Sequence, residues 1–265
     1  MESPIAWARR RTAFSQNNKT ANHPNTKPHT PMKRNLLLGL LTLCAGSLLA
    51  ADASPKDAAK KLADQKNYSW KTTVDAGPDA RFRPGPTEGR TEKDGFTTVT
   101  TSFGDNTTEA VLKGDKVVIS TEDGWQTAAE LSEGGGQPGP GRFLARMFQN
   151  FKAPAAQAED IAAKTKDLKE ADGAWKGDLT EEGAKQLLSF GGRRGGGAGP
   201  EISNAKGWVK FWIKDGVLTK FEHNVQGEMS FNNNDIKIDR TTTTEIKDVG
   251  TTKVTVPDGA KKKHS

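Results

Sequence analysis

The sequence is poor in the residue types that build chemical sites. Its 265 residues include one cysteine, one tyrosine and four histidines. Cys44 cannot form a disulfide within the chain, so stability must come from a packed core rather than from crosslinks. The four cysteine or histidine ligands at short spacing that define a structural zinc site are missing. After residue 50 the only histidines are His223 and His264, and no serine stands in a G-x-S-x-G context, so the sequence offers no Ser-His-Asp triad.

Long apolar runs are absent as well, apart from one near the start of the chain. Residues 32–35 form a short cationic head, residues 36–49 are almost entirely apolar, and small residues follow at Ala50, Ala51 and Ala53. This order is typical of a secretory signal peptide. The run is shorter than the roughly 20 residues that a membrane-spanning helix needs, so a retained anchor is the less favoured alternative. We therefore expect export to a periplasm or similar envelope space, with cleavage near Ala50 or Ala51 leaving a soluble protein.

Two features beside this segment leave alternatives open. Lipidation at Cys44 competes with ordinary cleavage, although Leu43, which precedes it, is not the small residue that lipoprotein processing needs. Residues 1–31 have almost no apolar pattern, and we interpret them as a disordered leader or a mis-assigned start. A twin-arginine signal is disfavoured because the arginines at 9–11 lie too far before the apolar run. The predicted organisation is thus a leader, a signal peptide over 32–51 and one domain over 52–265.

The basic charge of the whole chain belongs to this leader. The formal net charge is +6, but residues 1–50 hold seven basic residues and one acid, which leaves 32 of each sign in the remainder. A strongly basic protein would suggest a nucleic-acid or anionic membrane partner. Since the remainder is formally neutral, we expect no nucleic-acid partner.

Residue patterns after residue 53 predict an α+β domain. Ser54, Pro55 and Asp57 are typical of a helix start, so a helix is expected over 54–66. Strand spacing follows at 68–74. From about 81 to 127 the pattern is typical of β structure. Short segments rich in Thr and Val, such as 96–103, alternate with Asp-Gly and similar turns, which predicts an antiparallel meander.

A helical insert is predicted over about 142–190, between glycine-rich stretches at 134–141 and 191–199. Its first helix, 142–152, places three Phe, one Leu and one Met at helical spacing with three cations and no acid. An Ala-rich helix over 154–168, an extended segment over 169–179 and a helix capped by Thr180 complete it.

Three long strands are expected after the second glycine-rich stretch. Val209, Phe211 and Ile213 share one face of the first strand, and Val217, Phe221, His223 and Val225 share one face of the second. The third strand begins near Ile236. A short piece with Val254 and Val256 and a charged tail end the chain. The order of segments predicts one antiparallel sheet with helices gathered on one side.

Other patterns in the chain favour ordinary structural roles. His223 is expected to be a buried structural residue. Arg193 and Arg194, among glycines, favour a solvated loop over an anion site, and Asn232 to Asp239 favours a hairpin turn over a calcium loop, since the spacing differs from an EF-hand. We predict that the protein is not an enzyme and binds no cofactor or metal.

In layout, the chain resembles the bacterial lipoprotein-carrier superfamily, LolA-like and LppX-like proteins. The features that match are the helix at 54–66 leading into the strand at 68–74, the meander at 96–125, the insert at 142–190 and the paired strands at 208–225. The resemblance implies a curved sheet, an incomplete barrel whose concave side is covered by helices, with acyl chains in the cavity between them. It also implies a lipid, a lipidated protein or another apolar ligand as partner.

On this hypothesis, helix 142–152 forms a lid over the cavity and its cations meet a membrane surface. The large apolar side chains expected to line the cavity are Trp70, Phe96, Trp125, Phe143, Met147, Phe148, Phe151, Leu187, Trp208 and Phe221. Two alternatives stay open. One is a non-enzymatic protein-interaction module of the envelope on the same fold, with helix 142–152 as ordinary core or as an exposed apolar patch. The less favoured one is a hydrolase whose carboxylates, such as Asp178 and Glu222, converge in a cleft.

Overall fold

The computed structural model describes residues 53–77, 80, 83–104, 106–133, 139–189, 201–231 and 234–265. These residues belong to one compact unit, residues 48–265. The predicted leader and signal peptide, most of the first glycine-rich stretch and all of the second, and the Asn232–Asn233 turn lie outside the described residues.

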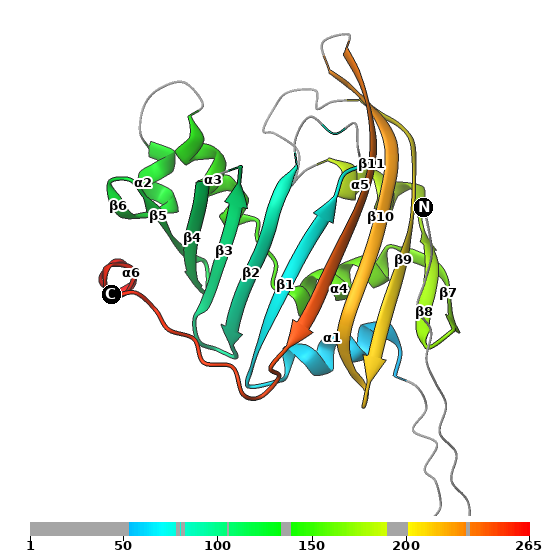
Figure 1. The fold of residues 1–265 in the computed structure, drawn as a ribbon, viewed down its shortest axis with the longest axis horizontal. Helices are drawn as coiled ribbons and strands as arrows, with labels where there is room; N and C mark the ends of the chain where they lie inside the picture. The colour runs from blue at the N-terminus through cyan, green and yellow to red at the C-terminus, as the bar shows by residue number, and fades with distance from the viewer. Residues whose placement is uncertain are drawn as a thin grey trace, which may run out of the picture. The chain divides into compact units, whose positions relative to one another are not determined.

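The described strands form one open antiparallel sheet of 11 strands (Figure 1). Their order is β6-β5-β4-β3-β2-β1-β11-β10-β9-β8-β7, so β6 and β7 lie at the edges and β1 pairs with the last strand of the chain. The sheet confirms the predicted α+β class. The strands are β1 (Asn67–Asp75), β2 (Pro84–Glu92), β3 (Thr97–Phe103), β4 (Asn106–Lys113), β5 (Lys116–Thr121), β6 (Gly124–Thr127), β7 (Thr165–Ala171), β8 (Ala174–Leu179), β9 (Glu201–Lys214), β10 (Val217–Phe231) and β11 (Asn234–Lys247).

The described residues also form six helices: α1 (Pro55–Ala63), α2 (Ala128–Glu133), α3 (Pro140–Gln149), α4 (Pro154–Ala163), α5 (Glu181–Leu188) and α6 (Asp258–His264). Two predicted caps are confirmed: the Ser54 hydroxyl accepts a hydrogen bond from the Asp57 amide at 3.3 Å, and the Thr180 hydroxyl accepts one from the Gly183 amide at 3.0 Å. No helix in the described part of the chain has the length and hydropathy that crossing a bilayer requires.

The inner face of the sheet, which we define as the face that carries α1 to α5, holds the main core. Trp70, Gly89, Val99, Ala110 and Ile119 stand opposite one another on five successive strands and share this face. All of these except Gly89 belong to one cluster that also includes buried residues of α1 to α5. Figure 1 shows these helices in two groups, with α2 and α3 near β4–β6 and with α1, α4 and α5 near β9–β11.

The outer face carries a second, smaller core under the end of the chain. It joins Val111 and Val118 to Val256 and Ala260, with Phe96, Trp125 and Val254 packed against it. The Lys263 ammonium forms an ion pair of 2.6 Å with Glu130. The segment predicted to be a charged tail is therefore a helix, α6, which packs on the face opposite to the other helices.

The insert contains a hairpin in addition to its helices. The Ala-rich helix was expected to reach residue 168, but α4 ends at Ala163 and β7 and β8 follow. Asp172 and Gly173 turn the hairpin with φ values of 54° and 73°, a conformation that suits Gly and Asp. Because β8 pairs with β9, the hairpin extends the sheet, and this pairing overrides the helix propensity of the Lys- and Leu-containing segment.

We predict that Gly89→Ala destabilises the protein by about 1–3 kcal/mol, the usual cost of overpacking a core. The reason is that a Cβ atom at Gly89 would overlap the Trp70 ring. Urea denaturation followed by tryptophan fluorescence or circular dichroism measures the change. The matched control is the double variant G89A/W70L, in which the smaller side chain removes the overlap; its cost should be less than the sum of the two single changes. If the destabilisation of the double variant equals the sum of the two single changes, Trp70 and Gly89 are not in this contact.

Candidate functional site

Six of the ten residues predicted to line a ligand cavity meet on the inner face. Trp70, Phe148 and Phe221 are buried in the main core, and Met147, Phe151 and Leu187 pack against it while partly exposed. These side chains come from β1, α3, the segment after α3, α5 and β10. The structure thus places residues more than 150 positions apart on one face of the sheet. Met147, Phe148 and Phe151 lie in or just after α3, while Leu187 and Phe221 belong to α5 and β10.

Helix α3 is attached to the inner face by side chains on one of its sides. Ala145 and Phe148 are 0% and 2% exposed. Just after the helix, the Phe151 ring stacks on the Trp70 ring, with 6.1 Å between centroids and an angle of 23° between planes. Phe143 lies about 140° around the helix from Phe148, since successive residues turn by about 100°, and it is 60% exposed.

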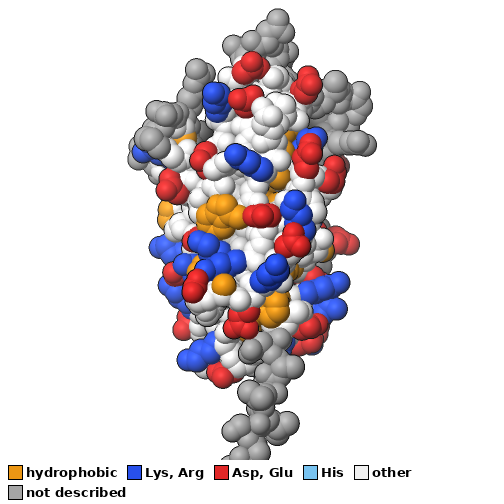
Figure 2. Space-filling view, turned by 90° about the vertical axis from the view of Figure 1, so that its right-hand side faces the viewer, with side chains coloured by type: hydrophobic (Ala, Val, Ile, Leu, Met, Phe, Trp, Pro, Cys, Tyr) orange, Lys and Arg blue, Asp and Glu red, His pale blue; other side chains and the backbone are white. Residues whose placement is uncertain are grey.

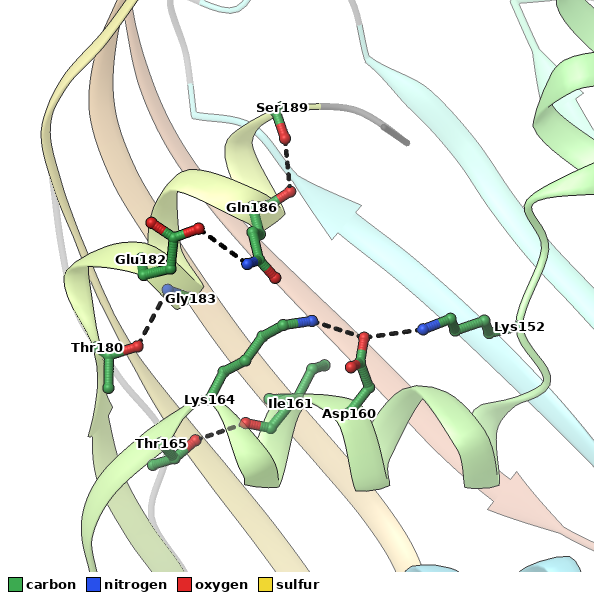
Figure 3. Close-up of polar contacts among 10 residues, drawn as sticks. All are labelled: Lys152, Asp160, Ile161, Lys164, Thr165, Thr180, Glu182, Gly183, Gln186 and Ser189. Carbon is green, nitrogen blue, oxygen red and sulfur yellow. Dashed lines mark hydrogen bonds and ion pairs between the residues drawn. The ribbon is translucent and has the colours of Figure 1, made fainter. Parts of the chain in front are cut away.

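Polar contacts tie down both ends of α3. At its start, the Arg142 guanidinium donates to the Ser132 carbonyl of α2 at 3.2 Å. After its end, the Lys152 ammonium reaches Asp160 of α4 at 3.1 Å, and Lys164 reaches the same carboxylate oxygen at 2.7 Å (Figure 3). Burial raises the pKa of Asp160, but hydrogen bonds from Lys164 and Lys152 outweigh it and hold this pKa below its usual value. Asp160 therefore stays ionised and keeps the link between α3 and α4 in place.

Four of the ten predicted residues lie elsewhere. Phe96 and Trp125 pack in the outer-face core under α6, because they alternate with the inward residues of β3 and β6. Trp208 precedes the inward Val209, so it faces outward, where the Lys210 ammonium lies 4.3 Å from the centre of its ring. Phe143 is on the solvent side of α3. The prediction that all ten line one cavity is therefore wrong for these four.

The inner-face cluster also contains two aromatic residues that were not among the ten predicted to line the cavity. The Tyr68 hydroxyl accepts a hydrogen bond of 3.5 Å from the Ala155 amide of α4, and burial raises the pKa of Tyr68 to about 12. The Phe211 ring stacks on Phe221 at 6.4 Å. Strand alternation would have found both, since Tyr68 stands two residues before Trp70 and Phe211 two after Val209.

Part of the inner face is polar although it is buried. Thr101 and Thr244 are 4% and 0% exposed, and each shares a hydrogen bond of 2.9 Å with another threonine, Thr87 and Thr72 respectively. Threonine suits strands and satisfies its hydroxyl across the ladder in these pairs. The central strands thus present a floor of paired hydroxyl groups next to the aromatic residues.

His223 and Arg240 extend this polar floor. His223 is 4% exposed, and its Nδ1 atom has no hydrogen-bond partner among the described residues. Arg240 donates to the Leu187 carbonyl of α5 at 2.9 Å. Burial, with a smaller effect of the Arg240 charge, lowers the pKa of His223 to about 4. His223 is buried and neutral at physiological pH. The sequence predicts a structural histidine with its hydrogen bonds satisfied, and the Nδ1 atom, open in the described part of the chain, departs from that prediction.

The outer face is charged with both signs. Seen from the side of β7–β9, Lys and Arg side chains alternate with Asp and Glu, and hydrophobic side chains are scattered between them (Figure 2). Asp178 and Glu222, the acids considered for a hydrolase, both face this way, and Glu222 lies 3.6 Å from Lys210 and 3.9 Å from Lys220. The carboxylate of Glu222 is thus held in structural ion pairs.

We predict that stability falls between pH 7 and pH 4 partly because of His223. Its pKa is about 4 in the folded state and about 6.5 when unfolded, so the unfolded state binds a proton first. The neutral histidine therefore contributes stability above pH 6.5 that is lost as the pH falls toward 4, about 3 kcal/mol in total. Urea titrations at several pH values should show a shallower pH dependence for His223→Gln than for the unchanged protein. If the free energy of unfolding depends on pH in the same way in both proteins, His223 is not responsible for the loss of stability.

Comparisons with known proteins identify no family by sequence: no family model matches, and no curated protein matches. Among solved structures, the chain is similar to the lipoprotein LppX of Mycobacterium tuberculosis, with 10% identity and a TM-score of 0.39 over 77% of this chain and 94% of that one. It is also similar to LprF of Mycobacterium bovis, with 11% identity and a TM-score of 0.39 over 78% and 95%. Both similarities concern the fold alone.

Proposed function

We propose that this is an exported envelope protein that binds or carries a long-chain apolar ligand, a lipid or a lipidated protein, on the inner face of its sheet beneath α3. The ligand would occupy the place now held by the side chains that attach α3, so α3 acts as a lid. The proposal needs no catalytic group and no cofactor.

The observation that carries this proposal is a large exposed apolar side chain, Phe143, on the solvent side of α3, across from the buried Phe148. Phe148 is buried against the sheet, while Phe143, on nearly the opposite side, is 60% exposed. A helix that serves only as core has no use for a large apolar residue on its solvent side. A lid that opens onto an apolar ligand or a lipid surface needs apolar residues on both sides.

The closed lid sets a minimum length for the ligand. Withdrawing a fully buried Phe or Met side chain from the core costs about 1.5–3 kcal/mol. Phe148 is buried and Phe151 and Met147 are partly exposed, so the three together cost roughly 6 kcal/mol at most. A buried methylene contributes about 0.8 kcal/mol. A ligand that buries about eight methylenes or more therefore offsets the opening of the lid, which selects long acyl chains over short ones.

The charge of α3 supports contact with an anionic membrane surface, where such a ligand would be taken up or released. Arg142 and Arg146 lie in α3 and Lys152 follows it, and the helix contains no acid. Exposed Phe143 stands beside these arginines. Cations around an exposed aromatic residue are typical of interfacial helices, with about 1 kcal/mol contributed by each cation near an anionic surface.

One observation favours the alternative, a protein-interaction module of the envelope. Phe211, Phe221 and Leu188 are at most 1% exposed, so much of the inner face is packed as ordinary core. In that case Phe143 would contact a protein partner, and the purified protein would hold no lipid.

We predict chain-length selection in native mass spectrometry of the purified protein. Fatty acids or lysolipids with 16-carbon chains should bind and those with 6-carbon chains should not, because only the longer chains offset lid opening. Replacing Phe151 by Ala removes part of the cost of opening and should let shorter chains bind. Val118→Ala is the matched control, since it weakens the outer-face core and leaves the lid unchanged. If the protein shows only its ligand-free mass with ligands of every chain length, the carrier function is wrong and the interaction module is favoured.

We predict that the protein sediments with vesicles that contain anionic phosphatidylglycerol, and less with neutral phosphatidylcholine vesicles. Arg146→Glu and Phe143→Ser should each weaken this binding about five-fold or more, given about 1 kcal/mol per cation and a similar apolar term. Lys169→Glu, an equal charge change at an exposed site on β7, should have a much smaller effect. An equal loss of binding with Arg146→Glu and Lys169→Glu, and none with Phe143→Ser, would show that net charge drives binding without a specific role for α3.

A further inference from the structure

A separate hollow lies on the outer face of the sheet, across from Trp70. Its volume is about 370 Å³, within the size range of small-molecule sites. It is lined by Ser69, Trp70, Lys71, Glu88, Gly89, Arg90, Thr98, Thr100, Lys247 and Asp248. The side chains of Trp70 and of the inward row face the other way, so the backbone around Gly89 forms the floor and polar side chains form the walls.

The strand register arranges these polar side chains in rows. Lys247, Ser69, Arg90 and Thr98 stand opposite one another on β11, β1, β2 and β3. Neighbouring strands lie about 4.8 Å apart, so this row of hydrogen-bond donors extends over roughly 14 Å. Lys71, Glu88 and Thr100 form part of the next row on the same face.

In the described part of the chain, the acids of the hollow accept hydrogen bonds from neighbouring side chains, whereas the Arg90 guanidinium is available to a ligand. Glu88 accepts from Lys71 at 2.8 Å, and Asp248 accepts from the Ser69 hydroxyl at 2.9 Å. The hydrogen bond from Lys71, together with the charges of Lys71, Lys247 and Arg90, holds the pKa of Glu88 below its usual value. Among the described residues, no hydrogen bond or ion pair engages the Arg90 guanidinium. In the strand register, the exposed Arg90 stands between Ser69 and Thr98.

We propose that this outer hollow binds a small polar anion that carries hydroxyl groups beside its phosphate or carboxylate. The planar guanidinium of Arg90 matches two oxygens of such an anion, and the Thr98 hydroxyl adds a donor at its side. The carboxylates of Glu88 and Asp248 accept hydrogen bonds from the hydroxyl groups of the ligand. This site is independent of the lid, because its side chains lie on the opposite face of β1 and β2.

The test is a titration of the ¹⁵N-labelled protein followed by NMR, with glycerol 3-phosphate, glucuronate and inorganic phosphate as separate probes. Glycerol 3-phosphate or glucuronate at about 1–10 mM, the range for a few polar contacts, should shift the amide signals of residues 69, 90 and 98. Inorganic phosphate should bind more weakly because it lacks the hydroxyl groups. Comparing the first two probes decides between a phosphate and a carboxylate.

Variants decide whether Arg90 is responsible. Arg90→Ala should weaken ligand binding about ten-fold or more. Arg90→Lys keeps the charge but loses the planar guanidinium, so its affinity should lie between those of the unchanged protein and Arg90→Ala. Lys116→Ala is the control, since it removes an equal charge from an exposed residue outside the hollow. No shifts with any probe up to about 10 mM, shifts that Arg90→Ala leaves unchanged, or equal affinity for inorganic phosphate would overturn the proposal. Lipid binding by native mass spectrometry stays unaffected by these variants, which separates this proposal from the function proposed for the inner face.

Discussion

The close approach of the Trp70 ring to Gly89 is the contact on which the inner face depends. The two residues stand opposite each other on β1 and β2, and the ring lies where a neighbouring side chain would otherwise be. The absence of a side chain at Gly89 lets the ring lie low on the sheet, where Phe151 stacks on it. Any side chain there would raise the ring, displace Phe151 and move the attachment of α3. One glycine thus positions the proposed lid, although it touches neither the lid nor a ligand.

Local signals in the sequence were enough to predict most of the elements and to place six of the large apolar residues on the inner face. The caps at Ser54 and Thr180 need only residues within one turn, and the spacing of Phe148 and Phe151 needs only one helix. Trp208 could also have been placed correctly, because it alternates with Val209 and Phe211 and must face the other way. The error at Trp208 came from choosing residues by size rather than by strand parity.

The remaining errors concern contacts between distant segments, which no local pattern contains. Phe96 and Trp125 are partly buried because α6, more than 130 residues later, packs against them. In the sequence, the Lys-rich segment of α6 is typical of a solvated tail. In the structure, Val256 and Ala260 hold it on the sheet together with the Lys263–Glu130 ion pair and the contact of His264 with Phe96. The β7–β8 hairpin is similar, since pairing with β9 decides its structure. Alternation assigns residues to two faces, but it does not say what covers each face.

The polar floor of the inner face affects how a ligand could lie under α3. The pairs Thr72–Thr244 and Thr87–Thr101 satisfy each other's hydroxyls, so an apolar chain can lie on them without leaving a buried polar group unpaired. Near His223 the situation differs, because its Nδ1 atom lacks a partner among the described residues. An unpartnered buried nitrogen is costly next to an apolar chain and favourable next to a hydrogen-bond donor. In the proposed function, the apolar part of the ligand therefore belongs at Trp70 and Phe148, and a polar end belongs toward His223 and β11.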